Sequence, residues 1–149
     1  MHSSARSIGL LLGTHLLLGL ATGCSGDDAS GSAACTGCSN AAGVWDTTEA
    51  VDGTACGNGT YTQTNSYLVT QSGCNLTVEP VSSSLTFQGT ICNDTLSWSG
   101  SYPDGSGTTT ITSSSYTLSG STFTGTARWT WVGSGQSCSG STAVTGTRE

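Results

Sequence analysis

Basic residues are almost absent from this chain of 149 residues, which contains no lysine and only three arginines. Both histidines, His2 and His15, and one arginine, Arg6, lie within the first 23 residues. The rest of the chain carries two arginines against nine acidic residues, a formal charge of −7. A protein that binds nucleic acid needs a basic face to neutralise phosphates. The composition therefore excludes nucleic acid as a partner.

The lack of histidine and lysine after residue 23 also excludes two common kinds of catalysis, because no histidine base or lysine nucleophile is available there. Asp46, Glu49 and Asp52 form an acidic cluster that we interpret as solvated turn residues. We therefore expect no catalysis and no cofactor. The alternative is a secreted hydrolase that uses Asp46 or Glu49 as its carboxylate. Asp104 lies in a turn without the ligand spacing of a calcium loop, so no metal site is predicted.

No apolar run in the sequence is long enough to cross a membrane. The longest runs from Ile8 to Ala21, whereas a spanning helix needs about 20 apolar residues. A basic residue, a short apolar stretch and a group of small residues are typical of a secretory signal. The small residues here are Ala21, Thr22 and Gly23, and Cys24 follows them directly. Residues 1–23 are therefore predicted to be a signal peptide.

The motif Leu20-Ala21-Thr22-Gly23-Cys24 resembles the cleavage box of bacterial lipoprotein signals, in which two small residues precede a cysteine. The resemblance implies that Cys24 becomes the first residue and carries a diacylglyceryl thioether and an acylated amino terminus. Several acyl chains on one residue anchor a protein stably to a membrane. The alternative is an ordinary secretory signal with Cys24 as a thiol. Lipidation of Cys24 would leave six of the seven cysteines, which can pair evenly.

Residues 24–42 have no apolar periodicity and are rich in glycine, serine and alanine, a composition typical of a flexible tether. Ser25, rather than aspartate, follows Cys24. By the same resemblance this implies a lipid-anchored protein of the bacterial cell envelope, in the outer membrane. The tether contains a Cys-x-x-Cys pair, Cys35 and Cys38, without a redox setting and without further zinc ligands. We predict a disulfide between them.

Residues 43–149 show the alternation of apolar and polar side chains that is typical of half-buried strands. It is clearest from Leu85 to Cys92, Leu96 to Tyr102 and Phe123 to Trp131, where one face carries bulky apolar residues and glycine. Short turns rich in glycine, asparagine and aspartate separate these stretches. The pattern predicts an all-β domain, a small antiparallel up-and-down barrel of about eight strands. The alternative is an immunoglobulin-like β-sandwich.

The domain opens with Gly43-Val44-Trp45 and closes with Thr147-Arg148-Glu149. These ends resemble those of the lipocalin and calycin barrels, in which a Gly-x-Trp begins the first strand and a late arginine lies across the tryptophan. The resemblance implies that Trp45 and Arg148 close one end of the barrel. A cation over an indole face contributes about 0.5–2 kcal/mol.

Four cysteines fall in the predicted barrel. In an up-and-down arrangement, successive turns alternate between the two ends, which places Cys74 and Cys92 at one end and Cys56 and Cys138 at the other. We therefore predict Cys74–Cys92 and Cys56–Cys138 disulfides. Three connectivities are open to four cysteines, so the choice depends on this geometry.

Four aromatic side chains fall on the inward faces of the predicted strands: Trp98, Tyr102, Trp129 and Trp131. They can form an ordinary core, or they can line a pocket for a small apolar or sugar ligand. Gly89, Gly100 and Gly125 share those faces and would leave room beside the rings. The sequence thus predicts a membrane-anchored lipoprotein whose barrel is structural or binds a small ligand.

Overall fold

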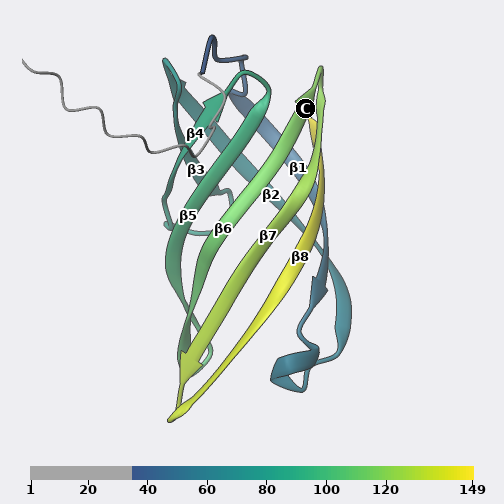
Figure 1. The fold of residues 1–149 in the computed structure, drawn as a ribbon, viewed down its shortest axis with the longest axis vertical. Helices are drawn as coiled ribbons and strands as arrows, with labels where there is room; N and C mark the ends of the chain where they lie inside the picture. Colours follow the sequence, from purple (N-terminus) through teal and green to yellow (C-terminus); the bar gives the residue numbers. More distant parts are fainter. Residues whose placement is uncertain (1–34) are drawn as a thin grey trace, which may run out of the picture. The chain divides into compact units, whose positions relative to one another are not determined.

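The computed structural model describes residues 35–149, and these fold into a closed barrel of eight antiparallel strands (Figure 1). Each strand pairs with the next along the chain, and the last pairs back with the first. The all-β up-and-down barrel is confirmed, and the sandwich alternative is wrong. The elements are β1 (Gly43–Asp52), the short 3-10 helix η1 (Thr54–Cys56), β2 (Thr60–Ser72), β3 (Asn75–Pro80), β4 (Phe87–Cys92), β5 (Thr95–Asp104), β6 (Gly107–Ser119), β7 (Thr122–Gly133) and β8 (Gln136–Arg148).

Tight turns join most neighbouring strands, because the sequence places residues there that accept a left-handed backbone. Between β7 and β8, Ser134 and Gly135 have φ of 51° and 76°, as a two-residue turn of mirror-image type requires. Asn93 takes φ of 52° between β4 and β5. These are turns that the sequence predicts. Longer connections occur only after β1 and after β3 among the described strands.

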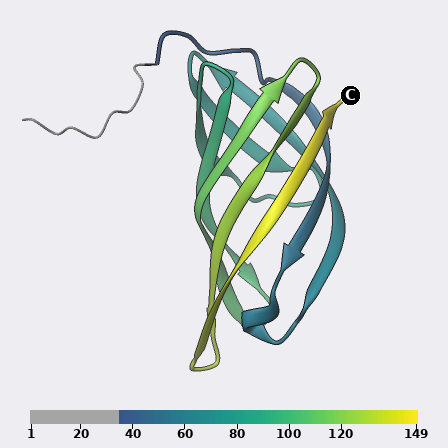
Figure 2. The same ribbon diagram turned by 45° about the vertical axis from the view of Figure 1, so that its right-hand side comes forward.

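The barrel has a packed end and an open end. Residues 35–42 lie across the packed end, and η1 lies at the opposite end in both views of the ribbon (Figures 1 and 2). At the packed end the ring of Phe123 lies 5.0 Å from that of Trp45 and 5.5 Å from that of Tyr116. Leu76, Val78, Ile91 and Leu96 are fully buried in the same cluster. The short strands β3 and β4 supply three of these four side chains.

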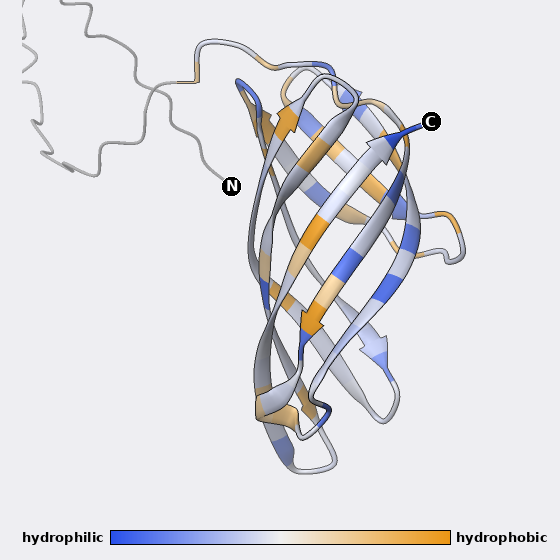
Figure 3. Ribbon diagram, turned by 90° about the vertical axis from the view of Figure 1, so that its right-hand side faces the viewer, coloured by the Kyte–Doolittle hydropathy of each residue, from blue (hydrophilic) through white to orange (hydrophobic). Residues whose placement is uncertain are grey.

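The outer surface of the barrel is polar but carries little charge. Serine and threonine occupy most outward positions of β8, and both β1 and β8 alternate regularly between buried and exposed residues. In Figure 3, strongly apolar residues appear as separate bands on strands of otherwise intermediate hydropathy. One face of each strand therefore lies on the interior and the other in solvent, as the alternation predicts.

The final residues of the predicted tether, 35–42, pack on the barrel. Ala41 is completely buried, and its carbonyl oxygen accepts a 2.9 Å hydrogen bond from Nε1 of Trp45. Ser39 and Asn93 are joined by a 3.0 Å backbone hydrogen bond from the Ser39 amide. Residues 35–42 therefore cover the core at the packed end, and these contacts attach them to the barrel.

One predicted disulfide is confirmed and two are wrong. Cys56 pairs with Cys138 as expected and ties η1 to β8 at the open end. Cys35 pairs with Cys92, and Cys38 pairs with Cys74, so the predicted Cys35–Cys38 and Cys74–Cys92 bonds do not form. Cys74 and Cys92 do lie at the same end, as the alternation of turns predicts. They do not bond to each other, because the segment 35–42 crosses that end and each of its two cysteines bonds to one of them.

Candidate ligand-binding cavity

A cavity of about 1010 Å³ occupies the barrel interior between the packed core and the open end. Its mouth is formed by residues near η1 and by the β5–β6 and β7–β8 turns, among them Asn58, Ser106 and Gln136. Its inner end reaches Phe87, Trp98 and Tyr116. Ligand pockets commonly have volumes of about 300–1,000 Å³, so the space is sufficient for a small organic molecule.

All four aromatic residues predicted to face inward line this cavity: Trp98, Tyr102, Trp129 and Trp131. The Trp98 ring stacks on Tyr116 with centroids 4.2 Å apart. Ser114 fixes the backbone of Trp98, because its hydroxyl accepts from the Trp98 amide at 2.8 Å and donates to the Trp98 carbonyl at 2.7 Å. Nearer the mouth, Nε1 of Trp131 donates to the backbone oxygen of Asp104 at 3.2 Å. These contacts hold Trp98 and Trp131 in place in the cavity wall.

Glycines on neighbouring strands accommodate these rings. Trp129 pairs across the sheet with Gly140, and a methyl group there would lie 2.6 Å from Cε2 of the indole. A methyl at Gly107, on β6, would lie 2.6 Å from Cζ2 of Trp131. At Gly100 the equivalent contact is 2.6 Å from the Phe87 ring. The prediction that inward glycines leave room for a ligand therefore needs correction, since protein atoms, here aromatic rings, already occupy that room.

At Gly89 and Gly125, the other two glycines expected to leave room, the neighbouring strand fills the space. A methyl at Gly89 would lie 2.9 Å from Cβ of Trp98, and one at Gly125 would lie 2.5 Å from Cα of Tyr116. Both pairs are direct cross-strand neighbours. These glycines permit the close approach of two strands at the inner end of the cavity.

Glu49 lies inside the barrel, although the sequence suggested a solvated turn residue. It is 7 % exposed and lies in the middle of β1, where Trp45, Thr47 and Val51 share its face. The signal that could have revealed it is this alternation, in which every second residue of β1 points inward. The sequence predicts a solvated turn residue instead, because acidic side chains are usually exposed.

The carboxylate of Glu49 is held by side chains of β1 and β2. Its Oε2 accepts a 2.7 Å hydrogen bond from Nε2 of Gln63, which is its direct partner in the sheet. Its Oε1 accepts a 2.9 Å bond from the Tyr67 hydroxyl and a longer one, 3.3 Å, from Thr47. All of these donors are neutral groups. The arrangement orients the carboxylate along one wall of the cavity.

Three tyrosines of the cavity wall have raised pKa values. Burial raises the pKa of Tyr67 far above its usual range, and the nearby Glu49 charge and hydrogen bond raise it further. Burial likewise raises the pKa of Tyr116, and burial together with the Asp104 charge raises that of Tyr102. These three phenols, called the inward tyrosines below, remain neutral hydrogen-bonding groups at physiological pH.

The other members of the acidic cluster lie on the outer face. Asp46 is exposed and accepts a hydrogen bond from Ser66, and Asp52 is exposed at the end of β1. Hydrogen bonds from Thr54 to the Asp52 carboxylate lower the pKa of Asp52. Asp46 and Glu49 are therefore on opposite faces of the same strand and do not form a catalytic carboxylate pair with each other.

Trp45 and Arg148, expected to close one end, are brought together by the pairing of β1 with β8. The guanidinium carbon of Arg148 lies 4.6 Å from the centre of the Trp45 ring, and Trp45 is completely buried. The Nη2 of Arg148 donates to the Asn40 carbonyl at 2.6 Å, whereas its buried Nε has no hydrogen-bond partner. The pair seals the packed end, away from the cavity mouth.

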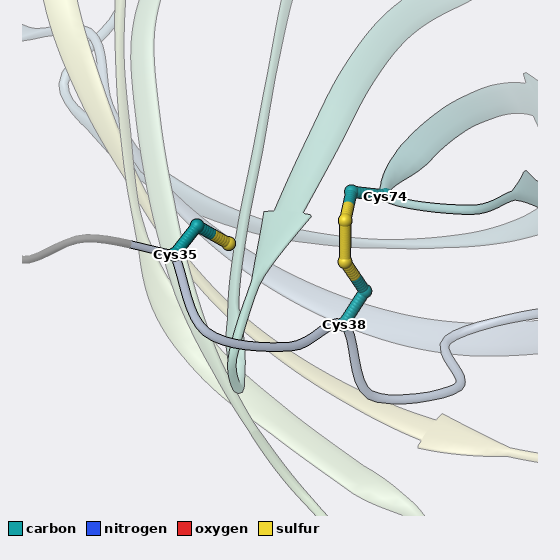
Figure 4. A group of neighbouring side chains, drawn as sticks. All are labelled: Cys35, Cys38 and Cys74. Atoms are coloured by element: carbon teal, nitrogen blue, oxygen red, sulfur yellow. A yellow bond between two sulfur atoms is a disulfide. The ribbon is translucent and has the colours of Figure 1, made fainter.

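The sulfur atoms of Cys35, Cys38 and Cys74 lie within 4.8 Å of one another beside the β2–β3 turn. Figure 4 shows Cys38 and Cys74 joined by a disulfide, with the Cys35 side chain close by. Metal ions bind thiolates, and here Cys35 is also bonded, to Cys92. In this oxidised form the cluster is a structural junction of the segment 35–42 with two turns.

The predicted lipidation site, Cys24, lies outside the described residues, as do the whole predicted signal peptide and the first part of the tether. Within residues 35–149, no helix has the length and apolarity needed to span a membrane. The chain matches no protein family model, no curated protein and no solved structure.

Proposed function

We propose that this protein is a lipoprotein of the bacterial cell envelope, anchored in the outer membrane by lipid on Cys24, whose barrel binds a small apolar or sugar ligand. The observation that supports binding is the cavity of about 1010 Å³, which is lined by three tryptophans and opens at one end of the barrel. Aromatic faces suit apolar molecules and sugar rings. A barrel that was only structural would fill this space with side chains.

The disulfide pattern supports the anchor. The three bonds use all six cysteines of residues 35–149, so none of these is left to pair with Cys24. An oxidising compartment favours disulfides of this kind, and a lone thiol there would be reactive. Lipidation of Cys24 accounts for the odd cysteine.

The position of the chain's entry into the barrel is also consistent with an anchored binding protein. Residues 35–42 lie on the packed end (Figure 2), whereas the residues that form the mouth lie at the other end. A membrane attachment upstream of residue 35 therefore joins the barrel at the end that a ligand does not enter. The mouth stays accessible without any rearrangement of the strands.

Binding is tested with N-phenyl-1-naphthylamine, a neutral apolar dye whose fluorescence rises in an apolar site. We expect saturable binding by the full chain and energy transfer from the cavity tryptophans. Ala127→Phe places a phenyl ring in the cavity, and Gln136→Trp narrows its mouth at an exposed turn. Both should weaken binding at least tenfold.

The two variants also serve as controls for background dye fluorescence in detergent. Gln136 is exposed, so its replacement should leave the barrel folded even where the core substitution does not. Equal dye binding by the original chain and by folded Gln136→Trp and Ala127→Phe proteins would refute a ligand site in the cavity.

The anchor is tested by mass spectrometry of the protein extracted from membranes. We expect a mass that corresponds to residues 24–149 with three disulfides and added acyl groups on Cys24. Cys24→Ser should release the protein into the soluble fraction with the barrel intact. An unmodified amino terminus at Cys24, or a start at another residue, would refute the anchor and leave the binding proposal standing.

A further inference from the structure

The charges that line the cavity are all of one sign. Glu49 and Asp104 are the only charged residues in its wall. Arg128, on β7, is exposed on the outer face, and Arg148 lies over Trp45 at the packed end. No other basic residue exists between residues 35 and 149. The cavity therefore presents negative charge to anything that enters it.

Glu49 is the more informative of the two carboxylates, because it is more than nine-tenths buried. An ionised carboxylate in such a place is costly unless a cation or a full set of hydrogen bonds compensates it. Its two short bonds, from Gln63 and Tyr67, come from neutral donors. No cationic side chain of the barrel approaches it.

The carboxylate also has unused capacity to accept hydrogen bonds. A carboxylate offers about four acceptor positions. The Thr47 hydroxyl has a single proton, and it lies closer to the Asn65 carbonyl, at 3.0 Å, than to Glu49, at 3.3 Å. Gln63 and Tyr67 therefore supply the two firm bonds. The remaining positions are available to a donor that enters the cavity.

The aromatic wall suits the same kind of donor. Cations bind over the faces of indole and phenol rings, and more strongly when water is excluded. Tyr67, which bonds Glu49, lines the cavity together with Trp98 and Tyr102. A buried carboxylate in a cavity lined by aromatic rings is complementary to a positive charge carried on an apolar body.

We propose that the ligand of this cavity is an organic cation, namely an amine whose ammonium group pairs with Glu49 while its apolar part lies among the tryptophans. This inference rests on the proposed ligand-binding function; it adds a positive charge to the apolar ligand proposed there and sets the sugar aside. A neutral lipid or a sugar would leave the buried charge of Glu49 without a counter-ion. An anionic ligand would face two like charges.

Three probes that share one scaffold test the inference by calorimetry on the full chain at pH 7. They are 2-phenylethylamine, which is a cation, 2-phenylethanol, which is neutral, and phenylacetate, which is an anion. We expect the amine to bind about 10- to 100-fold more tightly than the alcohol, as one charge-assisted hydrogen bond provides. Phenylacetate should bind most weakly of the three.

A matched pair of variants assigns the preference to Glu49. Glu49→Gln keeps the size of the side chain and removes its charge, and we expect the amine to lose its advantage over the alcohol. Asp46→Asn removes the same charge from the outer face of the same strand and should leave the preference unchanged. The comparison of the three probes on the original protein needs no variant, so it decides the question even where Glu49→Gln fails to fold.

The outcomes separate this inference from the function on which it rests. Binding of the naphthylamine dye without preference for 2-phenylethylamine would overturn the cationic ligand and keep the cavity as a binding site. Equal effects of Glu49→Gln and Asp46→Asn on amine affinity would also overturn it. If neither the dye nor any of the three probes binds, both the inference and the binding function fail.

Discussion

Gly140 provides the sharpest test of how the aromatic wall is built. It lies on β8 opposite Trp129, and a methyl group in its place would overlap Cζ2 of that indole and the backbone oxygen of Asp52. The backbone of Gly140 is not in the left-handed region, so alanine is disfavoured there by contact alone. The substitution Gly140→Ala therefore measures packing without a change in backbone preference.

The cost can be estimated from these contacts. Excess volume in a packed site destabilises a protein by about 1–3 kcal/mol. The upper part of this range applies because one of the overlapping atoms belongs to the backbone of β1, which is hydrogen bonded to β2 and β8. Loss of unfolded-chain entropy on replacing glycine offsets about 0.4–1 kcal/mol. The net loss in the free energy of unfolding should be about 2 kcal/mol.

Chemical denaturation followed by tryptophan fluorescence provides the measurement. We expect a lower midpoint and a shifted emission maximum in the folded state, because the Trp129 ring must move. Gly37→Ala is the control, since no atom lies within 4 Å of the added methyl group and Gly37 is exposed. It should change stability by less than about 0.5 kcal/mol. Equal stability of the Gly140→Ala and Gly37→Ala proteins would refute the packing argument.

Two further predictions concern the disulfide at the open end and the inward tyrosines. Replacement of both Cys56 and Cys138 by serine should cost up to about 4.5 kcal/mol in denaturation experiments, because the bond closes a loop of 82 residues; a loss below about 1 kcal/mol would contradict this. The raised pKa values of the inward tyrosines mean that the folded state holds more protons than the unfolded state above about pH 10. The free energy of unfolding should therefore fall as pH rises beyond that point. At pH 11 the tyrosinate absorbance should reach the value for all four tyrosines only when the protein is unfolded. Full ionisation of the tyrosines in the folded protein would contradict this.

The fold was predictable because two local signals agree along most of the barrel. Alternation assigned the inward faces of β4, β5 and β7, and glycine or asparagine marked the tight turns between strands. Up-and-down order needs no long connection, so a sequence of hairpins determines the topology once the barrel closes. Trp45 and Arg148, at the two ends of the domain, meet because β1 pairs with β8.

The disulfide pattern depended on information that local signals do not carry. Composition alone identified residues 35–42 as part of a tether, since they contain no alternating or helical pattern. Their position is determined by long-range contacts, such as the hydrogen bonds of the Ala41 amide and the Ser39 carbonyl with the Gln71 side chain. With the segment across the packed end, Cys35 bonds to Cys92 at the end of β4, and Cys38 bonds to Cys74 between β2 and β3.

The burial of Glu49 was not predicted, because the prediction followed its residue type and not its position in the strand. Acidic residues are seldom buried, so Asp46, Glu49 and Asp52 are predicted to be solvated turn residues. The strand period nevertheless separates them, because Glu49 differs by an odd number of positions from both neighbours and therefore faces the other way. Where period and residue type disagree inside a regular strand, the exception marks a candidate site.

The same small barrel contains both a core and a cavity because its strands differ in length. The six-residue strands β3 and β4 supply aliphatic side chains to the packed end. The strands β5 to β8 extend well beyond them toward the mouth (Figure 1). In that extension Trp129 and Trp131 lie over glycines of neighbouring strands. Glu49 of β1, which accepts hydrogen bonds from Gln63 and Tyr67 of β2, also lines the cavity. Rings placed against the wall leave the centre of the barrel open, so the glycine–aromatic pairs determine the cavity, and Glu49 and Asp104 determine its charge.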